Sequence, residues 1–287
     1  MIAIIPLWLV NVLSFITVFS VMTAIGTTIT PSVQHLLSPS LLIRGLVSVL
    51  VIVPIVGIAT TIAFRLTTAE QVGVTLMVIA PGAPLALRRA LHSGGDASFA
   101  PTLQIAVAIL AIPALPLWVL IGNWIVGTHG FVDAAAVARQ VLLAQLLPLV
   151  LGAVVKRAAP VSRMWIGTAL GRAGAILLIM VLISLAVNLH YSILVAHFWP
   201  IASAAITTLA AISAGHLLGG PLPEIRHAIA VGGAMRNVGL ALLVATTNQT
   251  APVVDVVILS YAITAIIIVS GYILWWTKPD LPRSRLP

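Results

Sequence analysis

A permanent cation and a side-chain amide are adjacent in one of the most apolar stretches of the chain. Residues 228–246 read AIAVGGAMRNVGLALLVAT, which is long and apolar enough to cross a bilayer as a helix. Arg236 and Asn237 follow two adjacent glycines, Gly232 and Gly233, near its middle. Ionisable residues inside membrane segments mark substrate or ion paths, and a guanidinium suits carboxylate, sulfate or phosphate because its donors form a planar fork. We predict an anion site at Arg236 and Asn237, with a break in the helix at the two glycines.

Arg236 also has a purely structural interpretation. Its guanidinium could hydrogen-bond to backbone carbonyls of another interrupted segment and replace a lost ion. Both interpretations predict that Arg236→Ala is damaging. Only the first predicts that substrate affinity changes while insertion and fold stay normal.

A second apolar segment, residues 72–91, is interrupted by Pro81-Gly82-Ala83-Pro84. Proline removes a backbone donor and clashes with the preceding turn, so a helix must break here. Paired discontinuous segments in corresponding positions of two inverted halves point to the binding site of a secondary transporter. We therefore place Pro81 and Gly82 in the same site as Arg236.

The composition predicts an all-α polytopic membrane protein. Of 287 residues, 61% are hydrophobic and 7% are charged, and the mean hydropathy is +1.19. The apolar runs do not alternate in polarity, which argues against a β-barrel. We expect about nine transmembrane helices in a single transporter domain, 1–287, at 2–25, 41–64, 72–91, 99–126, 134–155, 165–187, 191–217, 228–246 and 253–276.

The third and eighth of these spans would run in opposite directions. This arrangement predicts two inverted repeats, with a first half at about 1–127 and a second half at about 134–277. A short basic cytoplasmic tail, 278–287, follows the second half.

Basic residues predict the orientation. With an outside N-terminus, eleven of the 14 Lys and Arg residues fall at inner ends and loops, Arg65 and Arg139 fall outside, and Arg236 lies in the membrane. Because Lys and Arg concentrate on the cytoplasmic side, we expect an inner (plasma) membrane protein with a cytoplasmic C-terminus. Topology and anionic lipid explain the net charge of +8 without nucleic acid.

No pattern predicts catalysis. The chain lacks HExxH, G-x-S-x-G, a Walker A sequence and any cysteine, and it has no His/Asp/Glu cluster with metal-ligand spacing. We expect no enzyme activity, no metal and no cofactor. We expect Asp255 and His216 at membrane interfaces and Arg88 in cytoplasmic water.

Three segments resemble the bile acid:sodium symporter superfamily. PGAPLALRRALHSGGD (81–96) and AMRNVGLAL (234–242) resemble its two broken helices, and FSVMTAIGTTITPSVQHLL (19–37) resembles its second helix. The chain looks like a divergent bacterial member without the usual first helix. The resemblance implies a core domain with two crossed discontinuous helices, a panel domain beside it, and alternating access between them.

The resemblance also implies that most sodium ligands are missing. Asn237 is the one ligand residue retained in the second broken helix. The other ligand positions of the family fall on Ala86, Leu87, Ala100, Gln104, Gly232 and Arg236. Sodium prefers several oxygen ligands, so sodium coupling is not expected, and Gln104 is the remaining polar candidate near the first broken helix.

We therefore expect a secondary-active transporter of a small or amphipathic organic anion, with Na⁺ or H⁺ as the candidate coupling ion. One alternative is an ordinary sodium:organic anion symporter with relocated ligands. An alternative of another class is a non-transporting membrane sensor or assembly protein on the same fold. The expected binding residues are Arg236, Asn237, Gly232, Gly233, Pro81, Gly82 and Gln104.

Overall fold

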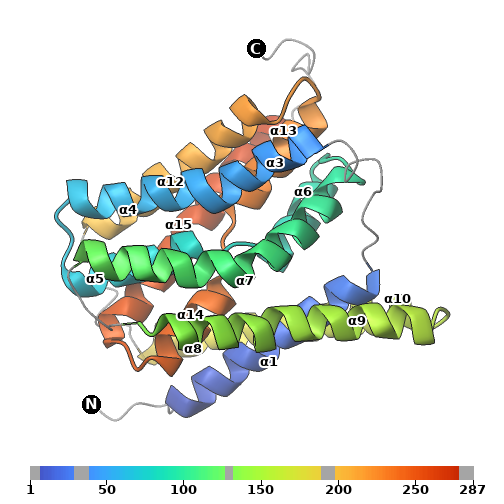
Figure 1. Ribbon diagram of the computed structural model, residues 1–287, viewed down its shortest axis with the longest axis horizontal. Helices are drawn as coiled ribbons and strands as arrows, with labels where there is room; N and C mark the ends of the chain where they lie inside the picture. The colour runs from blue at the N-terminus through green and yellow to red at the C-terminus, as the bar shows by residue number, and fades with distance from the viewer. Residues whose placement is uncertain (1–6, 29–38, 127–131, 189–197, 278–287) are drawn as a thin grey trace.

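The computed structural model describes residues 7–28, 39–126, 132–188 and 198–277, and all regular structure in these ranges is helical (Figure 1). Eight helices are long and apolar enough to cross a membrane. They are α1 (Leu7–Thr28), α3–η1–α4 (Pro39–Ala63), α7 (Phe99–Val126), α8–η2–α9 (Ala134–Ala158), α10 (Arg163–Asn188), α12 (Phe198–Leu218), α13–α14 (Pro223–Thr247) and α15 (Pro252–Trp276).

The third predicted span, 72–91, is not one of these eight helices, and it is formed by two shorter helices, α5 (Thr68–Ile79) and α6 (Pro84–His92). The all-α polytopic prediction is therefore confirmed. The predicted tail, 278–287, lies outside the described residues.

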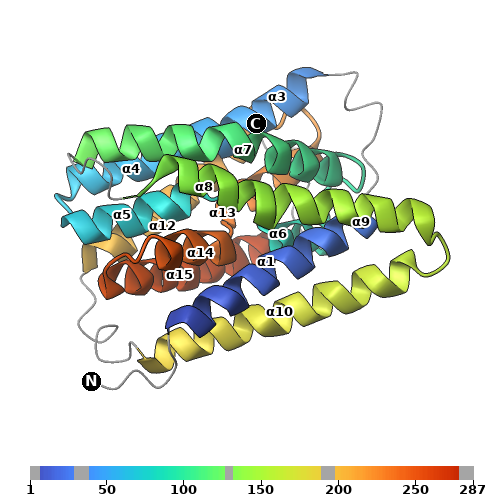
Figure 2. The same ribbon diagram turned by 60° about the horizontal axis from the view of Figure 1, so that its bottom comes forward.

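The helices form two groups. Helices α1, α8–α9 and α10 pack together along one side of the molecule, at the bottom of Figure 1, and this three-helix group comes forward in Figure 2. The remaining helices form a larger core. Contacts of α8 with α7, of α1 with α14 and α6, and of α10 with α15 join the two groups. The residues of both helix breaks belong to the core.

Glycines bring α1 and α9 into backbone contact. A Cβ atom built on Gly152 of α9 would lie 2.2 Å from the Thr23 carbonyl oxygen and 2.8 Å from the Cα atom of Gly26. Lipid gives apolar helices no hydrophobic reason to associate, so close packing at small residues provides much of the attraction. The small residues Gly26 and Gly152 therefore allow α1 and α9 of the three-helix group to pack closely.

The first break lies where the prolines place it. Helix α5 begins with a capping box, in which Glu70 accepts from the backbone N–H of Thr67, and it ends at Ile79. Gly82 has φ +77°, a left-handed conformation that favours glycine, and Pro84 restarts the chain as the first residue of α6. The sequence prediction of a break at Pro81 to Pro84 is confirmed, with residues 80–83 outside the helices.

The second break lies three residues beyond the predicted one. Helix α13 (Pro223–Ala234) continues through Gly232 and Gly233, and α14 (Val238–Thr247) follows the non-helical residues 235–237. The glycine prediction was wrong because glycine permits a break without forcing one. Asn237 sets the restart, since its side-chain oxygen accepts from the backbone N–H of Leu240 and caps α14.

A π-helical turn, η1 (Ser48–Ile52), widens the second predicted span immediately before Pro54. Proline has no N–H, so the carbonyls four and five residues earlier lose a helical donor. The side chains of two distant residues replace it. Trp118 donates to the Leu50 carbonyl at 2.8 Å, and Arg236 donates to the Val49 carbonyl at 2.9 Å.

Candidate functional site

The two breaks meet in the middle of the core. The backbone N–H of Asn237 donates to the carbonyl oxygen of Ala80 at 2.9 Å. On the first break, the Gln104 amide nitrogen donates to the Gly82 carbonyl at 2.8 Å. Backbone freed by one broken helix is thus satisfied by the other or by α7. Non-helical backbone at membrane depth requires this kind of internal partner.

Arg236 is buried at this crossing, with 4% of its surface exposed. Its Nη2 donates to the Val49 carbonyl, while Nε and Nη1 have no hydrogen-bond partner in the described part of the chain. The Asn237 side-chain nitrogen also lacks a partner there. A buried charge is costly unless it is paired, so these unpaired donors indicate a place for an acceptor.

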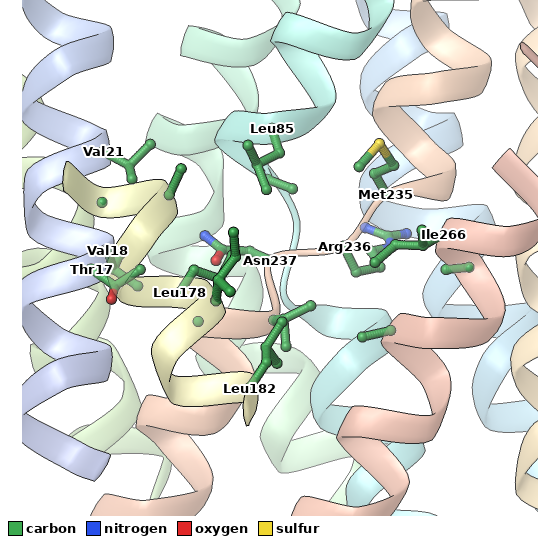
Figure 3. A pocket seen from close by; sticks show the side chains of 18 of the residues that line it. Thr17, Val18, Val21, Leu85, Leu178, Leu182, Met235, Arg236, Asn237 and Ile266 are labelled. Atoms are coloured by element: carbon green, nitrogen blue, oxygen red, sulfur yellow. The ribbon is translucent and has the colours of Figure 1, made fainter. Parts of the chain in front are cut away.

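A cavity of about 260 Å³ lies beside the crossing, between the core and the three-helix group (Figure 3). Arg236 and Asn237 line it from the break, Thr17 and Val18 from α1, and Leu178 from α10. Most of the remaining lining is aliphatic, and none of the lining residues is acidic. An apolar cavity with a cation in its wall suits a ligand that is both apolar and anionic.

Arg88, expected to face water, also lines the same cavity from α6. Its side chain is exposed yet rests against α10, where a Cβ atom on Gly171 would lie 2.1 Å from Arg88 Nη2. Glycine is therefore required for the observed position of this guanidinium. The cavity has a second cation at its wall, on an element different from that of Arg236.

A second, much smaller cavity of about 10 Å³ collects the positions where the resemblance places sodium ligands. Gln104 donates to a carbonyl there, and no carboxylate lines the space. Sodium needs several oxygen ligands, so these residues do not fit a sodium ion. The residues at the expected ligand positions that line it are Ala86, Leu87, Ala100, Gln104 and Gly232.

The predicted site residues therefore divide between two cavities. Arg236 and Asn237 line the larger one, while Gly82, Gln104 and Gly232 line the smaller one. Gly233 lines neither and packs inside α13 against Ala211 and Val49. Pro81 is buried at the first break and also lines neither.

Sequence reasoning missed the contributions of η1, α1 and α10. Pro54 could have indicated that the Val49 carbonyl needs another donor, because proline has no N–H to offer to a carbonyl four or five residues earlier. No sequence signal identified the α1 and α10 residues that close the cavity. Asp255, expected at an interface, lies in the first turn of α15 and is buried against other helices, with 5% of its surface exposed.

The geometry agrees with a comparison to known families. The model of the sodium bile acid symporter family matches residues 15–197. The match includes α5, the first break and α6, and it ends before α13 and α14. A comparison with curated proteins gave no significant match. Since the family match covers more than half of the chain, this protein belongs to the sodium bile acid symporter family and is a multi-pass membrane transporter of that type.

Proposed function

We propose that this transporter moves a small or amphipathic organic anion by alternating access, with the guanidinium of Arg236 as the fixed positive charge at the crossing. The observation that carries the proposal is the buried Arg236 in the wall of the 260 Å³ cavity, with Nε and Nη1 unpaired in the described residues. Both nitrogens are covered by protein atoms, so a carboxylate or sulfonate would supply the missing acceptors after a local movement of the break. The aliphatic wall would cover the rest of the molecule.

The position of the cavity supports a transport cycle. Its walls come from the core on one side and from α1 and α10 on the other. Relative motion of these two groups would open the cavity toward one face of the membrane and then the other. Rigid-body motion of one bundle against another around a fixed site is a general mechanism of secondary transport.

We further propose that sodium is not the coupling ion. The small cavity lacks a carboxylate, and the Gly82 carbonyl oxygen in its wall already accepts a hydrogen bond from the Gln104 side chain. An ordinary sodium symporter would require ligands elsewhere. A sensor or assembly protein on this fold would bind the anion without moving it.

The orientation and repeat organisation are part of the proposal. The excess of Lys and Arg at one set of helix ends supports an inner-membrane protein with its N-terminus outside and its C-terminus in the cytoplasm. The broken helices α5–α6 and α13–α14 support inverted halves at about 1–127 and 134–277.

Uptake into proteoliposomes tests the function. The probes are labelled organic anions, from steroid carboxylates to short 2-keto acids, each measured with no ion gradient, with a sodium gradient and with a proton gradient. We expect uptake of at least one anion in the complete absence of sodium. Arg236→Gln should lower that uptake by about tenfold or more, the equivalent of about 1.4 kcal/mol in binding.

Arg89→Gln is the matched control, because Arg89 is an exposed arginine of α6 that does not line the cavity. It should transport at the rate of the unmodified protein. Uptake that strictly requires sodium would contradict the proposed coupling. Binding of an anion with no uptake under any gradient would favour the sensor alternative.

A further inference from the structure

A second polar cluster lies beside the small cavity without lining it, where α6 ends, α13 begins and α15 ends. It joins side chains from four helices, Ser93, His216, His227 and Tyr272. His227 is completely buried, and Ser93 is buried beside it. His216 is half-buried. None of these residues lines a cavity described above.

The hydrogen bonds of the cluster have a single consistent direction. The Ser93 hydroxyl donates to the Arg89 carbonyl at 2.6 Å, so its oxygen accepts from Nε2 of His227, also at 2.6 Å. Nδ1 of His227 then accepts from the Tyr272 hydroxyl at 3.1 Å. The Tyr272 oxygen accepts from Nε2 of His216 at 2.8 Å. This assignment leaves both imidazoles neutral and links the half-buried histidine to the buried one.

We propose that His227 is a proton-binding site that is loaded through His216 and Tyr272. A proton taken up at Nδ1 of His216 lets its Nε2–H pass to the Tyr272 oxygen. The original Tyr272 hydroxyl proton passes to Nδ1 of His227. One proton enters, each N–H or O–H bond that breaks is replaced along the chain, and the product is an imidazolium at His227 with both other groups neutral.

The surroundings of His227 suit an imidazolium. Trp276 stacks on its ring with centroids 4.8 Å apart and an angle of 14°, and Tyr272 stacks at 5.4 Å and 23°. Aromatic faces attract cations, which offsets part of the cost of burying the charge. Among the described residues, the charged or titratable side chains on the packed elements near this end are Arg88, Arg89 and His92 of α6, Asp96 between α6 and α7, Glu224 and Arg226 of α13, His216 of α12 and Tyr272 of α15.

The proton-binding residue His227 is hydrogen-bonded between the two broken helices. Ser93 ends α6 and His227 lies in α13, so their hydrogen bond joins one half of each broken helix. Charging His227 would change the interaction of these halves with each other and with α15. The inference thus extends the proposed function by naming the ion that the core binds, but it can be tested without a transported anion.

Tryptophan fluorescence of the purified full-length protein in detergent is the test, titrated from about pH 5 to about pH 9, the range around an ordinary histidine. An imidazolium stacked on indole quenches its emission, so we expect one sigmoidal decrease on acidification. Trp276→Phe and His227→Gln should each lose this transition. Trp275→Phe and His92→Gln, which change neighbouring residues outside the relay, should keep it.

A pH jump in a stopped-flow instrument tests the relay. Tyr272→Phe keeps the aromatic ring but removes the hydroxyl, and we expect it to slow the fluorescence change at least about tenfold, as for loss of a positioned proton-transfer group. An unchanged titration in His227→Gln would overturn the proton site, and an unchanged rate in Tyr272→Phe would overturn its loading route. Either result leaves anion uptake as a separate question, since no anion is present.

Discussion

The backbone N–H of Asn237 and the carbonyl oxygen of Ala80 form a 2.9 Å hydrogen bond across the centre of the molecule. Each of these residues belongs to a break in a membrane helix, so each break supplies a partner to the other. The same residue, Asn237, also caps α14 and lines the larger cavity. The fold of the crossing and the chemistry of the cavity are therefore properties of the same three-residue segment, 235–237.

Substitutions of Asn237 should separate its two roles. Asn237→Ala removes the cap of α14 and should lower the free energy of unfolding by about 1 kcal/mol. Asn237→Asp keeps a capping oxygen but introduces a negative charge beside Arg236. We expect it to retain most of the stability while it abolishes anion binding, which thermal unfolding with and without the anion would measure. Equal anion affinity in Asn237→Asp and the unmodified protein would show that the anion does not approach this segment.

Arg236→Met tests whether the arginine serves the fold or the ligand. The substitution leaves the Val49 carbonyl without its donor, which should cost about 1–3 kcal/mol, but it also removes a buried and incompletely paired charge. We expect a shift of only a few degrees in the unfolding temperature, together with loss of the stabilisation by anions. A protein that fails to fold while Asn237→Asp folds normally would indicate that Arg236 is chiefly a structural plug.

Two glycines should respond in opposite ways to alanine. Gly152→Ala would place a methyl group 2.2 Å from the Thr23 carbonyl oxygen, where only backbone movement can relieve the clash, and should destabilise the protein by about 1–3 kcal/mol. At Gly232 a methyl group meets nothing within 4 Å, and Ala is the better helix former, so Gly232→Ala should stabilise by about 0.5–1 kcal/mol. Thermal unfolding in one detergent compares the pair. Destabilisation by Gly232→Ala would contradict this prediction and would indicate that a methyl group cannot be accommodated in the small cavity.

Pro54 and Trp118 should be energetically coupled through the Leu50 carbonyl. Trp118→Phe leaves that carbonyl without its donor and should cost about 1–3 kcal/mol. Pro54→Ala restores a backbone N–H that can replace the lost donor, so the same change should cost less in that background. A double-mutant cycle of unfolding free energies measures the difference, which for groups sharing one acceptor is typically about 0.5–3 kcal/mol. Simple additivity would refute the coupling.

The sequence predicted the helices well because hydropathy acts locally. Apolar runs located the crossings, and the break at residues 80–83 followed from Pro81 and Pro84 with Gly82 between them, where the chain adopts a φ of +77°. Prolines alone do not force a break, since α7 continues through Pro113 and Pro116. The second break could not be placed in the same way. Gly232 and Gly233 remain helical, while the chain unwinds at Met235, whose side chain has no intrinsic tendency to end a helix. Its position depends on Ala80, which is remote in sequence.

The sequence predicted the positive charge of the candidate site, but it did not predict which other helices line the cavity. An arginine in an apolar span is visible in the sequence and was found buried at the crossing. Its partner at Val49 and the cavity wall from α1 and α10 depend on how helices distant in sequence pack together. His216 was expected at an interface because terminal histidines usually lie there, whereas its link to Tyr272 requires the packing of α12 on α15.

The contact between Gly26 and Gly152 has a mechanical consequence. Two helices separated by side chains can slide, because flexible side chains repack as the helices move. Helices α1 and α9 meet backbone to backbone, with no side chain between them at this point to yield. The three-helix group thus has no internal joint along this seam. A change of shape that opens the cavity would therefore take place on the boundary with the core, where α1 meets α14, α8 meets α7 and Arg88 rests on Gly171.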